Sequence, residues 1–125
     1  MTTPTERALR ETTWFSATTD ALKALPLGTD GWATGATRTQ PAAVEKLLQV
    51  LTEVLDSQAP PPCIVPTHEG GVQAEWHCND VDLEIEVTPS GTVEYYFRSP
   101  LEEREERAEG DLSALAQYAQ AVRAR

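Results

Sequence analysis

Between Val72 and Val87 the chain alternates apolar and polar residues in two consecutive runs. The apolar positions are Val72, Ala74, Trp76 and Cys78 in the first run, and Val81, Leu83, Ile85 and Val87 in the second. A period of two is typical of a β-strand that buries one side. Asn79 and Asp80, between the runs, tolerate the left-handed backbone that a two-residue hairpin turn needs. The pattern therefore predicts an antiparallel hairpin.

This hairpin has one register in which every apolar residue faces another apolar residue. The expected pairs are Cys78 with Val81, Trp76 with Leu83, Ala74 with Ile85 and Val72 with Val87. A shift by one residue would carry all of these side chains to the polar side, so the register is strongly specified.

Two further strands extend the hairpin. The segment from Pro89 to Gly91 fits a three-residue turn. A strand after this turn would pair Val87 with Val93, Ile85 with Tyr95 and Leu83 with Phe97. A short strand from Cys63 to Val65, which follows three prolines, is expected to add a fourth strand at the edge.

The helical patterns lie on both sides of this region. The strongest runs from Thr39 to Ser57, with Pro41 in the first turn. Its apolar stripe follows the spacing i, i+3, i+4, i+7 and consists of Val44, Leu47, Leu48, Leu51, Val54 and Leu55. A shorter helix is predicted from Trp14 to Leu25.

The C-terminal part of the chain combines a charge run with a helical pattern. The segment from Ser99 to Asp111 is a charge run with a helix-start signal at Ser99 and Pro100 and a break at Gly110. A final helix is predicted from Leu112 to Arg123, with Asp111 as its N-cap.

These elements predict an α+β fold in which a three- or four-stranded antiparallel meander has two to three helices packed on one face. A length of 125 residues fits one domain, residues 1–125. Residues 1–12 are polar and rich in threonine, and are expected to be frayed or loosely docked. The glycine-rich segment from Gly28 to Gly35 lacks the sequence pattern of a phosphate-binding P-loop. Its large aromatic residue, Trp32, is instead expected to pack into the core.

The net charge of the chain limits the classes of partner that it is expected to bind. The formal net charge is -10, which would repel nucleic acids and anionic membranes, and no basic patch is apparent in the sequence. The N-terminal residues lack the apolar core of a signal peptide, and no run of about 18 apolar residues occurs. Two cysteines do not make a disulfide framework. The expected location is therefore the cytoplasm, with reduced thiols.

The polar side of the predicted sheet is acidic. The register places Glu75 opposite Glu84 and Glu86 opposite Glu94, and like charges in such pairs are unfavourable. One interpretation is a surface that awaits a basic partner; the alternative is an outer face kept soluble by its charge. The candidate partner-binding residues are Glu75, His77, Asp82, Glu84, Glu86, Glu94 and Tyr96.

Three chemical alternatives follow from the same residues. His77 and Asp82 resemble an oriented base, but no serine or cysteine is placed beside them, so no enzyme activity is expected. Zinc-type ligands occur at Cys63, His68, His77 and Cys78, with a spacing that matches no known finger or ribbon. Calcium-type ligands occur at Glu75, Glu84, Glu86 and Glu94. Carboxylates that stand side by side on strands, however, rarely surround an ion. No metal or cofactor is therefore expected.

Three sequence blocks resemble a family of small uncharacterised bacterial proteins. The blocks are GTDGWATGATRTQPAAVEKLL, PPCIVPTHEGGVQAEW and DLEIEVTPSGTVEYY. The resemblance covers about Leu22 to Tyr96, and its most specific part is Pro62 to Trp76. Ala33 stands where the family has aspartate, so any role of that acid does not carry over. The family has no established activity, and its members look like accessory or antitoxin-like proteins.

The leading interpretation is a small acidic interaction module, such as an antitoxin, immunity or adaptor protein. It would bind a basic protein partner through the acidic face of the predicted sheet or through the loop from His68 to Gly71 beside that face. One alternative is a structural or assembly subunit that uses Trp14 and Phe15 for contacts. The other is a small protein that binds a ligand or a metal. Oligomeric state is left open by the sequence.

Overall fold

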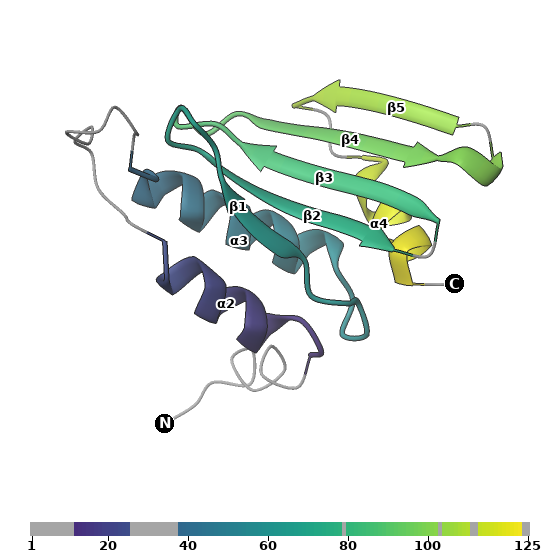
Figure 1. Ribbon diagram of the computed structural model, residues 1–125, viewed down its shortest axis with the longest axis horizontal. Coiled ribbons are helices and arrows are strands. Elements are labelled where there is room, and N and C mark those ends of the chain that lie inside the picture. The colour runs from purple at the N-terminus through teal and green to yellow at the C-terminus, as the bar shows by residue number, and fades with distance from the viewer. Residues whose placement is uncertain (1–11, 26–37, 79, 103, 111–112, 124–125) are drawn as a thin grey trace.

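The computed structural model describes residues 12–25, 38–78, 80–102, 104–110 and 113–123. These residues form an α+β fold (Figure 1). The helices are α2 (Phe15–Lys23), α3 (Pro41–Val54) and α4 (Leu115–Arg123), with a short 3-10 helix, η1, at Pro100–Glu102. The strands are β1 (Cys63–Pro66), β2 (Val72–Cys78), β3 (Val81–Val87), β4 (Val93–Ser99) and β5 (Arg104–Glu109).

The strands form one antiparallel sheet in the order β1-β2-β3-β4-β5. The predicted register between β2 and β3 is confirmed at every pair, from Cys78 with Val81 to Val72 with Val87. The predicted pairs between β3 and β4 are confirmed as well. Asp80 has the left-handed backbone expected of the hairpin turn, with φ of 62°. The alternation of apolar and polar residues, together with the turn residues, was therefore sufficient to predict the meander of β2, β3 and β4.

In the described part of the chain the sheet has five strands, instead of the three or four predicted. The charge run that suggested a helix after Ser99 forms η1 and then β5. Glutamate and arginine favour helices, but the unpaired edge of β4 offers a row of backbone hydrogen-bonding groups. Pairing with that edge outweighs the local preference, and an edge strand needs no apolar stripe.

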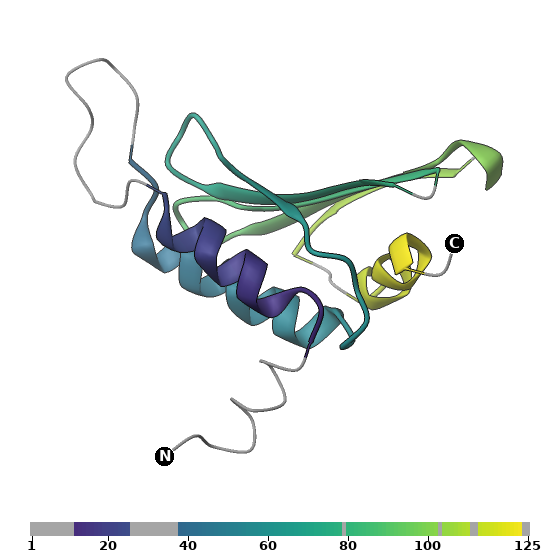
Figure 2. The same cartoon turned by 60° about the horizontal axis from the view of Figure 1, so that its bottom comes forward.

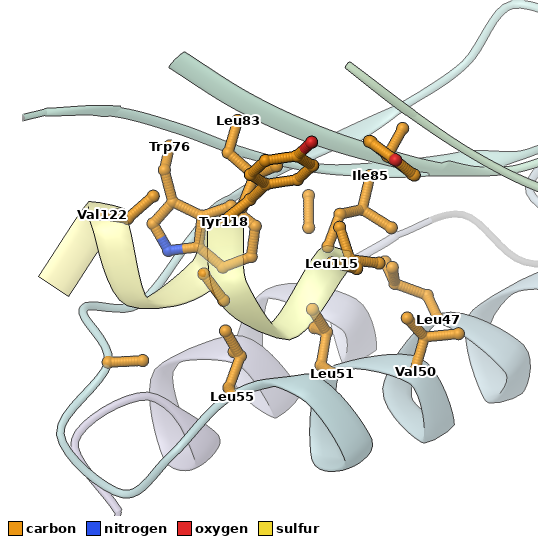
Figure 3. Close-up of a cluster of buried hydrophobic side chains, with 14 of the residues drawn as sticks. Leu47, Val50, Leu51, Leu55, Trp76, Leu83, Ile85, Leu115, Tyr118 and Val122 are labelled. Atoms are coloured by element: carbon orange, nitrogen blue, oxygen red, sulfur yellow. The ribbon is translucent and has the colours of Figure 1, made fainter. Parts of the chain in front are cut away.

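The helices lie on the same side of the sheet as one another (Figure 2). Helices α3 and α4 contact β3, α3 also contacts β2, and α2 contacts β1. Side chains of α3 and α4 point towards the inner face of the sheet (Figure 3). The fully buried members of this core include Leu47, Val50, Leu51, Val72, Leu83, Ile85, Val87, Phe97, Leu115, Tyr118 and Val122.

The observed helices are shorter than predicted. Helix α3 ends at Val54, because Leu55 has an extended backbone with ψ of 138°. Helix α4 begins at Leu115, not at Leu112. The expected frayed segment 1–12 falls, up to residue 11, outside the described residues, as do Trp32 with its glycine-rich segment and the predicted N-cap Asp111.

Two tryptophans hold the link between α3 and β1. The indole Nε1 of Trp14 donates to the carbonyl oxygen of Asp56 at 3.1 Å, and that of Trp76 donates to the carbonyl oxygen of Pro60 at 2.8 Å. Only 1% of Trp14 is exposed. The suggestion that Trp14 is a contact for assembly is therefore wrong, since its ring is part of the core.

Candidate functional site

The outer face of the sheet, which points away from the helices, carries three rows of side chains that cross from β2 to β5. The first row is His77, Asp82, Arg98 and Glu105; the second is Glu75, Glu84, Tyr96 and Arg107; the third is Gln73, Glu86, Glu94 and Glu109. We call these three rows the acidic face. All seven candidate residues from the sequence lie on it, in the predicted pairs.

The first row combines two carboxylates with a histidine and an arginine. The Nδ1 atom of His77 lies 2.8 Å from Oδ1 of Asp82, and its Nε2 atom lies 3.6 Å from Oε2 of Glu75. The hydrogen bond to Asp82 raises the pKa of His77, against a smaller lowering by burial and with further help from the charges of both carboxylates. Arg98 stands between Asp82 and Glu105 in the register. Both carboxylates of this row therefore have Arg98 as a neighbour in the register.

In the second row, a neutral side chain partly relieves the repulsion between two glutamates. The Nε2 atom of Gln73 donates to Oε1 of Glu75 at 2.5 Å and to Oε1 of Glu84 at 2.9 Å. One amide therefore bridges the like-charged pair that the sequence predicted. The guanidinium carbon of Arg107 lies 5.1 Å from the ring centre of Tyr96, within reach of a cation–π contact.

The third row has no cation of its own. Glu86 is opposite Glu94, and Glu94 is opposite Glu109. Partial burial raises the pKa of Glu86, and the charges of Glu94, Glu69 and Glu84 raise it further. Negative charge on the acidic face is therefore least compensated at this end of the sheet.

Glu69 lies near this end of the sheet, in a hydrogen-bonded turn between β1 and β2. The backbone N–H of Gly71 donates to Oγ1 of Thr67 at 2.8 Å, and the N–H of Thr67 donates to the carbonyl oxygen of Gly71 at 3.1 Å. The N–H of Gln40, just before α3, donates to the carbonyl oxygen of Gly70 at 2.9 Å. The turn is thus tied both to itself and to the helix layer.

A shallow hollow of about 590 Å³ lies over the second and third rows. Its lining residues are Gln73, Glu84, Glu86, Glu94, Tyr95, Tyr96, Arg107, Ala108 and Glu109. We call it the acidic hollow. Sequence reasoning missed Glu109 and Arg107 because β5 was not predicted. Glu69 lies in the loop from His68 to Gly71, which the sequence offered as an alternative contact surface, but its approach to Glu86 could not be predicted because the strand register does not place a turn.

The structure brings together neither set of metal ligands considered above. Among the described residues, no group of three or more histidine, cysteine, aspartate or glutamate side chains is arranged to hold a metal ion. Cys63 is exposed at β1, whereas Cys78 packs against the core, where burial raises the pKa of its thiol. Adjacent strand residues such as His77 and Cys78 point to opposite faces. Among the described helices, none is long and apolar enough to cross a membrane.

Comparison of the chain with protein-family models, with curated proteins and with solved structures finds no significant match. The resemblance of the three sequence blocks to a bacterial family therefore stays a prediction.

Proposed function

We propose that the protein is a small interaction module that binds a basic protein partner through its acidic face, as an antitoxin, immunity protein or adaptor would. The observation that carries this proposal is the third row, where Glu86, Glu94 and Glu109 stand side by side. Like charges directly opposite one another destabilise a sheet. A basic partner would relieve that repulsion, whereas the isolated fold gains no stability from it.

The proposed centre of binding is the acidic hollow, and not the whole of the predicted site. His77 and Asp82 already satisfy each other at 2.8 Å, so a partner cation would have to compete with an existing contact. Glu84, Glu86 and Glu94 line the hollow together with Tyr96. These carboxylates suit the lysine or arginine side chains of a partner, and Tyr96 offers them an aromatic surface.

The cytoplasmic location belongs to the same proposal. Cys63 is exposed and forms no disulfide. An exposed free thiol persists most readily in a reducing compartment. The first row, where His77 and Asp82 already contact each other, would form the rim of the interface, with little effect on affinity.

The test begins with a pull-down of the tagged full chain from its native lysate at low and at high salt, followed by mass spectrometry. A stoichiometric partner with a basic surface that is lost at high salt is expected, because salt screens such contacts. The affinity of this partner is then measured for the double variant Glu86→Gln with Glu94→Gln. We expect binding to weaken by about tenfold or more.

The matched control is the double variant Glu45→Gln with Glu53→Gln. Both residues are exposed on α3, in the helix layer and away from the outer face. The two double variants remove the same number of charges, so only position differs. Equal loss of affinity in both would show that net charge alone attracts the partner, and would refute a site at the acidic hollow.

A further inference from the structure

The two edges of the sheet differ in the backbone groups that they expose. The N–H of Gly110 donates to the carbonyl oxygen of Val93 at 2.9 Å, which makes this a hydrogen-bonded pair of the ladder between β4 and β5. Because such pairs alternate along antiparallel strands, Glu105, Arg107 and Glu109 direct their N–H and C=O groups away from β4. No strand of the described part of the chain lies beyond β5 (Figure 1).

The opposite edge is largely closed to pairing. The N–H of Thr67 donates to the carbonyl oxygen of Gly71. Because hydrogen-bonded pairs alternate, the backbone N–H and C=O groups of Val65 and Cys63 face β2, and the backbone groups of Ile64 and Pro66 face the open edge. Proline has no N–H, and strand edges that end in proline resist further pairing. An added strand would therefore find a longer row of donors at β5.

The order of charges along β5 makes this edge complementary to itself. An antiparallel copy centred on Ala108 would place Arg107 opposite Glu109 of the partner copy and Glu109 opposite Arg107 of the partner copy. These are residues with outward backbone groups, so each pair would exchange hydrogen bonds. Ala108 would face its own copy in the close, non-hydrogen-bonded type of pair, where its small side chain fits. Glu106 would face Gly110, so no like charges meet among the described residues.

We propose that β5 is a homodimer interface, in which two copies of the chain pair antiparallel about Ala108 and join their sheets into one. Charged edge strands ordinarily repel other strands. Here the charges of β5 are complementary to those of a second, antiparallel copy of β5. The two-fold axis would stand perpendicular to the sheet, so both acidic faces would lie on the same side and remain open. The proposal does not depend on the function proposed above.

The first test uses sedimentation equilibrium of the full chain at about 0.15 M salt, where repulsion between the two acidic copies is largely screened. A monomer–dimer equilibrium is expected at protein concentrations up to about 1 mM. The single variants Arg107→Glu and Glu109→Arg each replace two symmetry-related attractions by repulsions. Each should weaken the dimer roughly tenfold. The double variant restores both pairs and should recover dimerisation.

The second test places proline at two positions of the same edge. Glu109→Pro removes an outward N–H within the paired segment and should abolish the dimer. Glu105→Pro removes an outward N–H beyond that segment and should leave it intact. Because neither N–H bonds to β4, both variants should keep the far-ultraviolet circular dichroism spectrum of the parent.

Three outcomes would overturn the proposal. The first is a strictly monomeric parent at every concentration. The second is a dimer that is unaffected by Glu109→Pro, which would lie on another surface. The third is a dimer lost with Glu105→Pro and kept with Glu109→Pro, which would use a different register.

Discussion

The negative charge of Glu86 on the acidic face destabilises the folded state. Its carboxylate is half-buried on β3, and its pKa is raised first by that burial and then by Glu94, Glu69 and Glu84. A raised pKa means that the folded state favours the protonated form. At neutral pH the folded protein therefore carries a charge that it would be more stable without.

We expect Glu86→Gln to stabilise the free protein while it weakens partner binding. The gain in the free energy of unfolding at neutral pH should be about 0.2–1 kcal/mol, the range for cross-strand charge pairs. Urea denaturation followed by circular dichroism measures it. A loss of stability in this variant would mean that Glu86 makes a favourable contact that outweighs the repulsion.

The same residue predicts a pH dependence. Since the folded pKa of Glu86 lies above its ordinary value of 4.5, its stabilising contribution is complete below that value and is lost as pH rises through the folded pKa. Glu86→Gln should therefore flatten the fall in stability on the alkaline side of 4.5. His77, whose folded pKa lies above 6.5, adds a second fall at higher pH, and this should persist in the Glu86→Gln variant.

Gly71 is needed for packing at the turn that carries Glu69. A Cβ atom there would lie 2.9 Å from Oγ1 of Thr67 and closer still to the carbonyl oxygen of Val87. Gly71→Ala should therefore lower the free energy of unfolding by about 1–3 kcal/mol, as overpacking does. Adding Thr67→Ala should give no rescue, because the nearer obstacle is backbone. Full recovery in this double variant would place the strain at Thr67 instead.

Among the elements, α3 contributes the most regular apolar stripe to the core. Leu47, Val50 and Leu51 are each no more than 1% exposed. The helix was predicted correctly because its spacing fits one face of a helix over several turns. The buried stripe is shifted from the predicted one, since it includes Ala43 and Val50, while Val44, Leu48 and Val54 are only partly buried. The C-terminal end was predicted less well, since it depends on where the link to β1 leaves the core.

Leu51→Ala should cost about 2–5 kcal/mol of the free energy of unfolding, through lost burial and the cavity left behind. Leu101→Ala is the matched control, because Leu101 in η1 is 71% exposed; its effect should stay within about 0.5 kcal/mol. Thermal and urea denaturation of both variants give the comparison. Similar losses would show that η1 packs more tightly than its exposure indicates.

For the whole molecule, the net charge of -10 makes self-repulsion a general cost. Sodium chloride between about 0.02 and 0.5 M should raise the midpoint of urea denaturation, because it screens exposed charges. The gain should be smaller for Glu86→Gln, which already lacks one repelling group. A midpoint that falls with salt would mean that attractive pairs such as His77 with Asp82 dominate the electrostatics of the fold.

The meander and its acidic pairs could be read from the sequence, because alternation of apolar and polar residues permits only one register and that register also fixes the outer face. Strand β5 could not, since an exposed edge strand buries too little to leave a pattern, and its pairing is specified by the free edge of β4. The acidic hollow depends on that strand, and the turn between β1 and β2 adds the charge of Glu69 near Glu86. Contacts across strands and layers therefore decided where the charge concentrates, while local periodicity decided that the face would be acidic.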